Sequence, residues 1–360
     1  MVTEAHVEPV RARRDFSSLA LSAVGLALVV LVVVWLGINL AQDPARFFRV
    51  SLIGISQGAL YALVALGYTL VYGILELINF AHGDVFMIGG MITASIVLQV
   101  FAMNENPAFG VLIAAFLVSL ALSVVGCALL NATVERLAYK PLRNAPRLAP
   151  LITAIGVSFI LENVAILWKG TRPVALPVSE FAQGSGHKLF TIGTCPHCVV
   201  YTTDRLFIIV VTVPVLLLLM WLVRYTRQGK AMRAAAQDKD AAAMMGIDVD
   251  RTISFTFLVA GALAGVGGTI FAFYASTIGY GTGFTLGLFA FTAAVLGGIG
   301  NLPGAVLGAV LIGMIQAWNE GLPWHTPGPA WTQSIVFSIL ILILVFRPQG
   351  LLGERTPEGS

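Results

Sequence analysis

Charged residues are scarce in this chain of 360 residues. Only 11% of the residues are Asp, Glu, Lys or Arg, whereas 58% are hydrophobic, and the mean hydropathy is +0.88. Because a soluble domain carries about a quarter charged residues, the composition excludes a soluble globular protein and indicates a polytopic membrane protein. The net charge of +3 is small, and no basic stripe with interleaved aromatics occurs, so nothing supports a nucleic-acid partner.

Cysteine is also rare, and three cysteines cannot build a disulfide scaffold. Cys127 lies in an apolar run and is expected to be a small core residue. The spacing of Cys195-Pro-His-Cys198 occurs in disulfide oxidoreductases, but its loop is too short and too rich in Pro and Gly for the βαβ context. A zinc site with His187 and His197 would need four ligands from one cramped loop. We therefore expect a loop disulfide or two ordinary thiols, no metal site and no enzyme.

A phosphate-binding loop is absent as well. Gly229-Lys230 lacks both the earlier glycine and the hydroxyl residue of that motif. The chain is therefore expected to hold no cofactor and not to hydrolyse ATP by itself.

Long apolar runs dominate what is present. The first run, Leu19 to Ile38, follows Arg11, Arg13 and Arg14, and it is too long for a signal peptide, so we interpret it as a retained span. Runs of about 20 residues suit a membrane-spanning helix. Nine more are predicted at 50–75, 84–103, 109–134, 149–168, 205–223, 252–276, 284–300, 304–320 and 331–347.

These runs predict an all-α, polytopic membrane bundle of about ten transmembrane helices. We divide the chain into a basic leader with an extra first helix (1–48), one transmembrane domain (49–352) and a short tail (353–360). The transmembrane domain contains an outer loop at 169–204 and an inner segment at 224–251. Of the 21 Lys and Arg residues, 15 lie in the segments assigned to the cytoplasm, which predicts that both termini are cytoplasmic.

The stretch from Tyr72 to Gly90 carries polar residues within an apolar tract. Asn79, His82 and Asp84 lie there with Gly73 and Gly83 nearby. Ionisable groups at membrane depth face a bundle interior or an aqueous cavity, and broken helices often mark a substrate path. Tyr72, Asn79, His82 and Asp84 are therefore candidate path residues. A short cytoplasmic turn is the alternative, and the sequence leaves both open.

A second interrupted stretch runs from Thr292 to Gly308. Its glycines, which include Gly297, Gly298 and Gly300, would let helices approach closely. The functional interpretation is a broken or re-entrant segment that corresponds, late in the chain, to the first stretch. On that interpretation Thr292, Gly297 and Gly298 join the candidate path.

The inner segment from Gly229 to Asp250 is rich in alanine, the best helix former. Gly246 sits where a helix would end in a left-handed cap. A short helix with small residues can lie in another protein's groove, so Ala235, Asp238, Ala242 and Gly246 are candidate contacts to a partner. A solvated loop helix is the alternative.

Several blocks of the sequence resemble a known family. The blocks are Gly67-Tyr-Thr-Leu-Val-Tyr-Gly73, Ile78-Asn-Phe-Ala-His-Gly-Asp84, Glu135-Arg-Leu-Ala-Tyr-Lys-Pro-Leu-Arg143, Ala154-Ile-Gly156 and Phe291-Thr-Ala-Ala-Val-Leu-Gly-Gly-Ile-Gly300. Together with the alanine-rich inner segment, they resemble the H-type permease subunit of the branched-chain amino acid ABC importers. The resemblance runs from about Val50 to Leu352. The first span and Cys195-Pro-His-Cys198 depart from the family pattern.

The resemblance implies an ABC-importer permease in the bacterial inner membrane, carrying branched-chain or other hydrophobic amino acids. It also implies partners: a second permease subunit, two ATPase subunits that bind ATP-Mg, and an extracytoplasmic binding protein. Residues 224–251 would then be the coupling segment to the ATPases. Urea or short-chain amides are an alternative cargo. A stand-alone secondary transporter or channel is an alternative from another class.

Overall fold

A computed structural model describes most of the chain. The described residues are 16–75, 79–103, 108–143, 145–146, 148–178, 188–192, 199–347 and 349–353. The predicted basic leader and the Cys195-Pro-His-Cys198 motif lie outside them.

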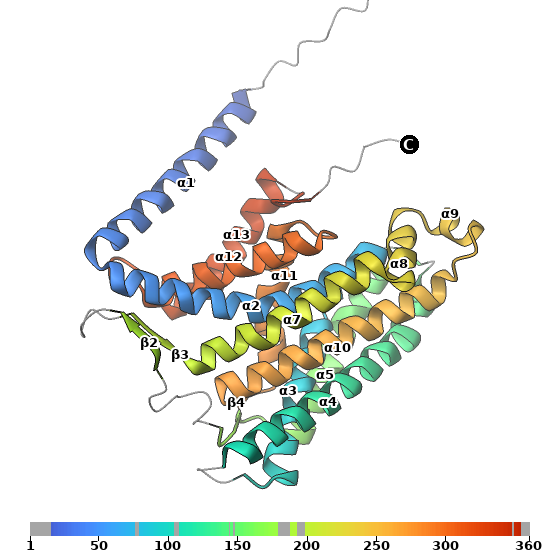
Figure 1. Ribbon diagram of the computed structural model, residues 1–360. Helices are drawn as coiled ribbons and strands as arrows, with labels where there is room; N and C mark the ends of the chain where they lie inside the picture. The colour runs from blue at the N-terminus through green and yellow to red at the C-terminus, as the bar shows by residue number, and fades with distance from the viewer. Residues whose placement is uncertain are drawn as a thin grey trace, which may run out of the picture.

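Helices account for nearly all of the described chain (Figure 1). Their bounds are α1 Phe16–Gln42, α2 Pro44–Leu75, α3 His82–Ser95, α4 Phe109–Val134, α5 Leu148–Lys169, α7 Thr203–Tyr225, α8 Arg227–Gln237, α9 Lys239–Met244, α10 Val249–Ala275, α11 Thr282–Gly297, α12 Leu302–Gly321 and α13 Thr332–Phe346. Short π turns, Ile96–Val100 and Glu135–Tyr139, extend α3 and α4, and 3₁₀ turns occur at Lys140–Leu142 and Pro329–Trp331.

The predicted membrane bundle is confirmed. Eight helices in the described part are long and apolar enough to cross a membrane, and the apolar helices Val29–Gln42 and Thr282–Gly297 are shorter. Each of the ten predicted spans coincides with a helix, and the prediction for α4 matches its bounds. With 16 residues, α11 is about 24 Å long. It is therefore shorter than a typical hydrocarbon core of about 30 Å.

The structure also contains two small antiparallel sheets, which the all-α prediction did not include. Strand β1 (Val174–Ala175) pairs with β4 (Thr277–Ile278), and β2 (Lys188–Ile192) pairs with β3 (Val199–Thr202). Strands β1 to β3 come from the predicted outer loop. Figure 1 shows β2 and β3 at the opposite end of the bundle from α8 and α9.

Helix α10 is the central element of the core. It packs along its length against α4, α3 and α2. Glycines allow the close approach: a methyl group on Gly261 would lie 2.4 Å from the carbonyl oxygen of Cys127 on α4, and one on Gly268 would lie 2.3 Å from the carbonyl oxygen of Phe86 on α3. The backbones therefore touch where any side chain would separate them, as in other membrane bundles.

Hydrogen bonds between helices add to this packing. The Ser123 hydroxyl lies 3.0 Å from the carbonyl oxygen of Gly89 and 3.1 Å from that of Gly265, so it joins α4 to both α3 and α10. The hydroxyls of Thr93 and Thr269 lie 3.0 Å apart. Because lipid offers no hydrogen-bond partner, such small hydroxyl residues hold helices together inside a membrane.

A second glycine seam joins α2 to α12. A methyl group on Gly58 would lie 2.5 Å from the Cα of Val310, and one on Gly313 would lie 2.4 Å from the backbone nitrogen of Gly58. Helices α2 and α12 therefore form one tightly packed unit, and the buried half of α2 is continuous with the main core.

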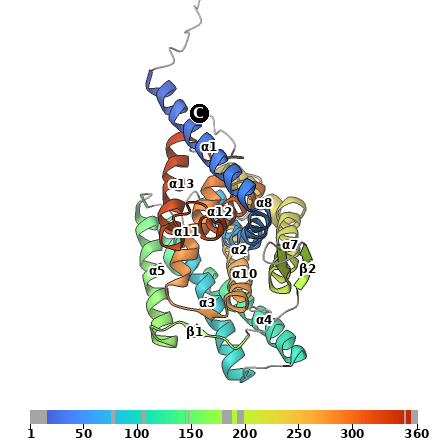
Figure 2. The same cartoon turned by 90° about the vertical axis from the view of Figure 1, so that its left-hand side faces the viewer.

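Helix α1 diverges from the bundle along most of its length (Figures 1 and 2). Its contacts are with α2 and α13. Near its end, the Trp35 indole donates to the carbonyl oxygen of Trp324 at 3.1 Å, and the Asn39 side chain accepts from the Trp324 amide at 3.1 Å. The described part of α1 is thus fixed at one end and leaves Val29 to Val34 exposed.

The glycine seam gives a testable prediction. Gly58→Ala should lower the apparent melting temperature of the detergent-solubilised protein, because overpacking of this kind costs about 1–3 kcal/mol. Gly156→Ala on α5 is the matched control, since no atom lies within 4 Å of its added methyl group. This control should be neutral or slightly stabilising. Equal melting temperatures for the wild type and Gly58→Ala would contradict the prediction.

Candidate functional site

The first candidate stretch begins α3 inside the bundle. The His82 ring is fully buried, and its centroid lies 5.0 Å from that of Tyr68 on α2. It also occupies the space over Gly67, where a methyl group would lie 2.0 Å from Nε2. Gly67 precedes the end of α2 at Leu75 by eight residues, or about 12 Å along the helix axis. The start of α3 therefore lies beside α2 rather than beyond its end.

Hydrogen bonds fix the residues before α3. The Asn79 carbonyl oxygen accepts from the His82 amide at 3.1 Å, and its side-chain oxygen accepts from the Tyr139 hydroxyl at 2.7 Å. The Ala81 carbonyl oxygen accepts from the amides of Asp84 and Val85. Asn79 is 2% exposed, which places it inside the protein. The first turn of α3 is buried as well.

Asp84 lies where the first turns of α3 and α11 meet. One carboxylate oxygen accepts from the Ser158 hydroxyl on α5. The other has no hydrogen-bond partner among the described residues and lies beside Gly283 at the start of α11. A methyl group on Gly83 would lie 2.4 Å from the Gly283 carbonyl oxygen, so the two helix starts are in contact. Both helix N-termini carry partial positive charge, which favours a carboxylate there.

Helix α5 adds a second carboxylate near Asp84. Glu162 lies one turn beyond Ser158 on α5, is half-buried, and interacts electrostatically with Asp84. It is the only acidic residue in the span predicted at 149–168. An isolated carboxylate in a span indicates function, and that signal was available in the sequence but did not enter the prediction.

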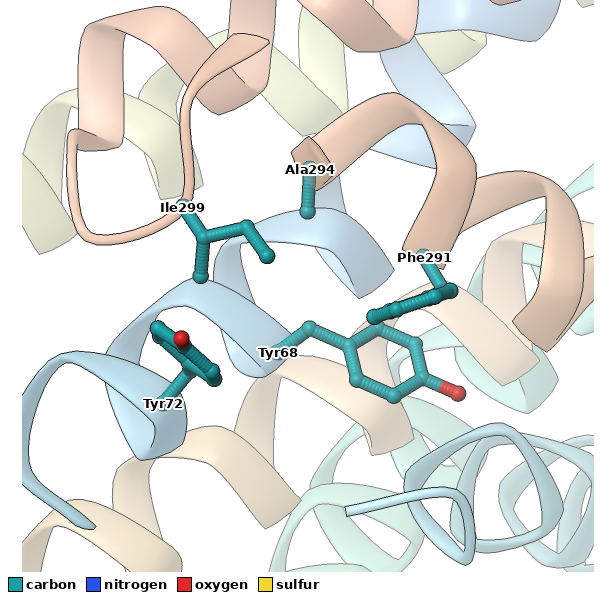
Figure 3. A pocket seen from close by; sticks show the side chains of 5 residues that line it. All are labelled: Tyr68, Tyr72, Phe291, Ala294 and Ile299. Carbon is teal, nitrogen blue, oxygen red and sulfur yellow. The ribbon is translucent and has the colours of Figure 1, made fainter. Parts of the chain in front are cut away.

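A pocket lies between the end of α2 and the α11–α12 turn (Figure 3). It encloses about 200 Å³ of empty space, part of it open to solvent, and is lined by Tyr68, Tyr72, Phe291, Ala294 and Ile299. In Figure 3 the two tyrosines project from α2 toward Phe291, Ala294 and Ile299. One chain therefore supplies a small, mainly aromatic and aliphatic hollow.

Tyr68 connects the pocket to the start of α3. Its ring centroid lies 5.9 Å from that of Phe291, which lines the pocket, and 5.0 Å from that of His82. A methyl group on Gly287 would lie 3.0 Å from the Tyr68 hydroxyl oxygen. The structure thus places Tyr72 in the pocket and His82 and Asp84 beyond Tyr68. Sequence reasoning missed Tyr68, although it lies in one of the family blocks.

The second candidate stretch forms the tight turn between α11 and α12. A methyl group on Gly297 would lie 1.9 Å from the Gly304 carbonyl oxygen, and Gly298 has φ of +107°, which side chains rarely adopt. Thr292 is fully buried, and its hydroxyl donates to the Leu288 carbonyl oxygen within α11 at 2.9 Å. Ile299 lines the pocket, whereas none of the three predicted path residues here is among its lining residues.

The segment after α13 covers this turn. The amides of Leu351 and Leu352 donate to the carbonyl oxygens of Leu296 and Gly297 at 2.8 and 2.9 Å. The Asn301 side chain donates to the Leu352 carbonyl oxygen at 2.7 Å. The segment after α13 thereby pairs carbonyl groups that the end of α11 leaves without a partner inside the helix.

The inner segment forms α8 and α9, as predicted. Helix α9 ends in a Schellman motif: Gly246 has φ of +81°, its amide donates to Ala243, and the Ile247 amide donates to Ala242. The predicted left-handed cap at Gly246 is confirmed. Asp238 caps the start of α9 by accepting from the amides of Asp240 and Ala241.

Burial separates the predicted coupling residues into two groups. Ala235 and Ala242 are 1% and 4% exposed and face the protein, whereas Asp238 and Gly246 are exposed. The most exposed apolar residues of this segment are Met244 and Met245, at 83% each. Methionine suits adaptable binding surfaces. Its exposure here was not anticipated from the sequence.

No group of three or more His, Cys, Asp and Glu side chains in the described part of the chain is arranged to hold a metal ion. Cys127 is buried and free. Its sulfur contacts the Val85 carbonyl oxygen at 3.4 Å, between α4 and α3.

Comparison with known proteins places this architecture in a family. Residues 51–345 match the family described as "Branched-chain amino acid transport system / permease component". The matched region begins within α2, so it leaves out α1. No solved structure matches the chain.

Curated relatives extend over most of the chain. It is 38% identical over 306 residues to the high-affinity branched-chain amino acid transport system permease protein LivH of Escherichia coli (strain K12), covering 85% of this chain and 95% of the relative. It is 36% identical over 308 residues to LivH of Salmonella typhimurium and 38% identical over 308 residues to BraD of Pseudomonas aeruginosa, each with the same coverage. The family is one of transport permeases rather than enzymes. The chain therefore belongs to the branched-chain amino acid transport permease family.

Proposed function

We propose that this chain is a transmembrane subunit of an ATP-driven importer that carries branched-chain amino acids across the bacterial inner membrane. Its partners would be a second permease subunit, two ATPase subunits that bind and hydrolyse ATP-Mg, and an extracytoplasmic binding protein. The observation that carries the proposal is the family match over residues 51–345. The pocket between α2 and the α11–α12 turn, and the exposed helix pair at one end, support it.

The pocket suits an aliphatic side chain. Phe291, Ala294 and Ile299 offer apolar contact, and the two tyrosine rings close the other side (Figure 3). A branched-chain amino acid gains by burying its side chain there, whereas urea has no apolar group to bury. The lining therefore favours the amino acid over urea or short-chain amides. Because the hollow in one chain is small and partly open to solvent, the remaining wall would come from the second permease subunit.

We assign each end of the bundle to one side of the membrane from the distribution of positive charge. The α8–α9 end and the segment after α4 carry most of the Lys and Arg residues of the described chain, which supports their placement in the cytoplasm. Both termini would then be cytoplasmic, and β2 and β3 would face the binding protein. The exposed Met244–Met245 pair beside the Gly246 cap is proposed to enter a groove on an ATPase subunit. A carrier that acts alone would need no such surface.

Reconstituted transport tests the cargo. The complex of this chain with its partner subunits, in proteoliposomes with ATP inside and binding protein outside, should accumulate labelled leucine, isoleucine and valine. Unlabelled urea in large excess should not compete. Uptake that persists without ATPase subunits, or competition by urea, would contradict the proposal.

Accessibility tests the path. Single cysteines at positions 79, 82 and 84, in a background without Cys127, Cys195 and Cys198, should react with a membrane-permeant thiol reagent at rates that change between resting and ATP-trapped complexes. Alternating access changes which residues water can reach. A cysteine at Ile88, buried one turn further along α3, is the matched control and should stay slow in both states. Fast and identical labelling of positions 79, 82 and 84 in both states would identify a cytoplasmic turn instead.

The Gly246 cap tests the coupling segment. Gly246→Val should leave the protein in the membrane but abolish uptake and weaken its association with the ATPases, because a β-branched residue resists φ of +81°. Ala243→Val is the control, since this exposed position lies within regular helix. Copurification of the ATPase subunits and leucine uptake are the measurements. Normal uptake by well-expressed Gly246→Val would refute the role.

A further inference from the structure

A chain of polar contacts connects the start of α10 to the residue before α3. Helix α10 follows directly on α8 and α9, and Asp250 lies in its first turn. Asp250 pairs with Arg143, which follows the end of α4, and also with Lys140 at 2.9 Å. Arg143 pairs in turn with Glu135, where α4 passes into its π turn. The first turn of α10 and the end of α4 are thus held together.

Glu135 is the most deeply buried member of this cluster. Its side chain is fully buried, and its two oxygens receive Arg143 and, at 2.8 Å, the Ser254 hydroxyl on α10. A buried carboxylate that loses a partner is left with an uncompensated charge, which is costly. The exposed Lys140–Asp250 pair contributes little by comparison. If α10 moves, Glu135 keeps its partners only when the end of α4 moves with it.

The π turn connects Glu135 to Tyr139, so a movement of Glu135 also displaces Tyr139. The turn comprises Glu135–Tyr139, and such turns are frequent at functional sites. The Tyr139 ring centroid lies 5.5 Å from that of Phe257, one turn beyond Ser254 on α10. Its hydroxyl donates to the Asn79 side chain at 2.7 Å. Tyr139 therefore touches both α10 and the break that precedes α3.

Asn79 completes the connection to the site. Its carbonyl oxygen accepts from the His82 amide at 3.1 Å, so its position and that of the first turn of α3 are linked. The contact between Tyr139 and Asn79 is buried on both sides. The sequence separates these two residues by 60 positions, and the hydrogen bond between their side chains crosses from α4 to α3.

We propose that Tyr139 and Asn79 are positioning residues that transmit the displacement of α8, α9 and α10 to the start of α3. Movement of the ATPase-facing helices shifts the first turn of α10. Arg143 and Glu135 carry the end of α4 with it, and the Tyr139 hydroxyl moves Asn79 and thereby His82 and Asp84. This inference rests on the proposed importer function and names the residues that couple its two ends.

Tyr139→Phe is the decisive variant, because it keeps the ring on Phe257 and removes only the hydroxyl. In reconstituted complexes, leucine transported per ATP hydrolysed should fall about three- to tenfold, the effect of one lost hydrogen bond on an equilibrium. The ATPase rate and the copurification of the ATPase subunits should stay unchanged. Tyr280→Phe is the matched control, since Tyr280 is exposed in the turn before α11, outside the coupling segment at 224–251, and should have no effect.

A double-mutant cycle with Asn79→Ala shows whether the two residues act as a pair. In the Asn79→Ala background, Tyr139→Phe should cause no further loss, because the hydroxyl has already lost its acceptor. Wild-type transport per ATP in Tyr139→Phe, additive losses in the cycle, or a loss of uptake that tracks dissociation of the ATPases would each overturn the inference.

Thiol labelling needs no transported amino acid, so it tests this inference independently of the proposed function. The nucleotide-dependent labelling of a cysteine at position 82 should lose most of its response to ATP in Tyr139→Phe and keep it in Tyr280→Phe. A wild-type complex that takes up no leucine would refute the proposed cargo, while a retained labelling response in Tyr139→Phe would refute the relay.

Discussion

Peptide groups cannot be left unpaired in hydrocarbon, and the interruptions of this bundle are organised by that constraint. Before α3, the carbonyl oxygens of Asn79 and Ala81 accept from the first amides of the helix. Before α11, the Ser276 carbonyl oxygen accepts from the Leu176 amide beside the β1–β4 pair. Between α11 and α12, the segment after α13 supplies the donors. The first of these breaks is satisfied by neighbouring residues, and the other two are covered by chain from elsewhere in the sequence.

Close helix packing makes room for these breaks. Glycines bring α10 against α3 and α4, α2 against α12, and the starts of α3 and α11 against each other. The last contact places Asp84 between two helix N-termini and beside Ser158. A buried carboxylate is costly unless charge and hydrogen bonds compensate it. The convergence of the two helix starts therefore has an electrostatic reason as well as a steric one.

The two ends of the bundle differ in what they expose. At the α8–α9 end, a capped helix pair presents two methionines, and an ion-pair cluster ties α10 to α4. At the opposite end, short strands and tryptophan contacts tie loops to helices. The proposed importer would use this asymmetry, because its ATPases and its binding protein would approach from opposite sides. The π turn after α4 connects this ion-pair cluster, through Tyr139, to Asn79 before α3.

The sequence by itself determined the features that depend on neighbouring residues. Apolar runs located the ten helices because hydropathy is a local property. Gly246 was identified as a cap because a Schellman motif needs only a few consecutive residues. The family blocks identified the class of transporter. The short strands departed from the all-α prediction: β1 pairs with β4 from a distant part of the chain, and β2 pairs with β3 within the outer loop.

Tertiary structure decided which face of each element is used. Ala235 and Ala242 were expected to contact a partner, yet they face the bundle, because the way α8 and α9 pack determines which small residues remain exposed. Tyr72 faces a pocket, whereas Thr292 bonds within its own helix. The contacts of Asp84 with Ser158 and of Tyr139 with Asn79 join residues 74 and 60 positions apart. No local pattern encodes such pairs, because they exist only after close-packed helices bring distant side chains together.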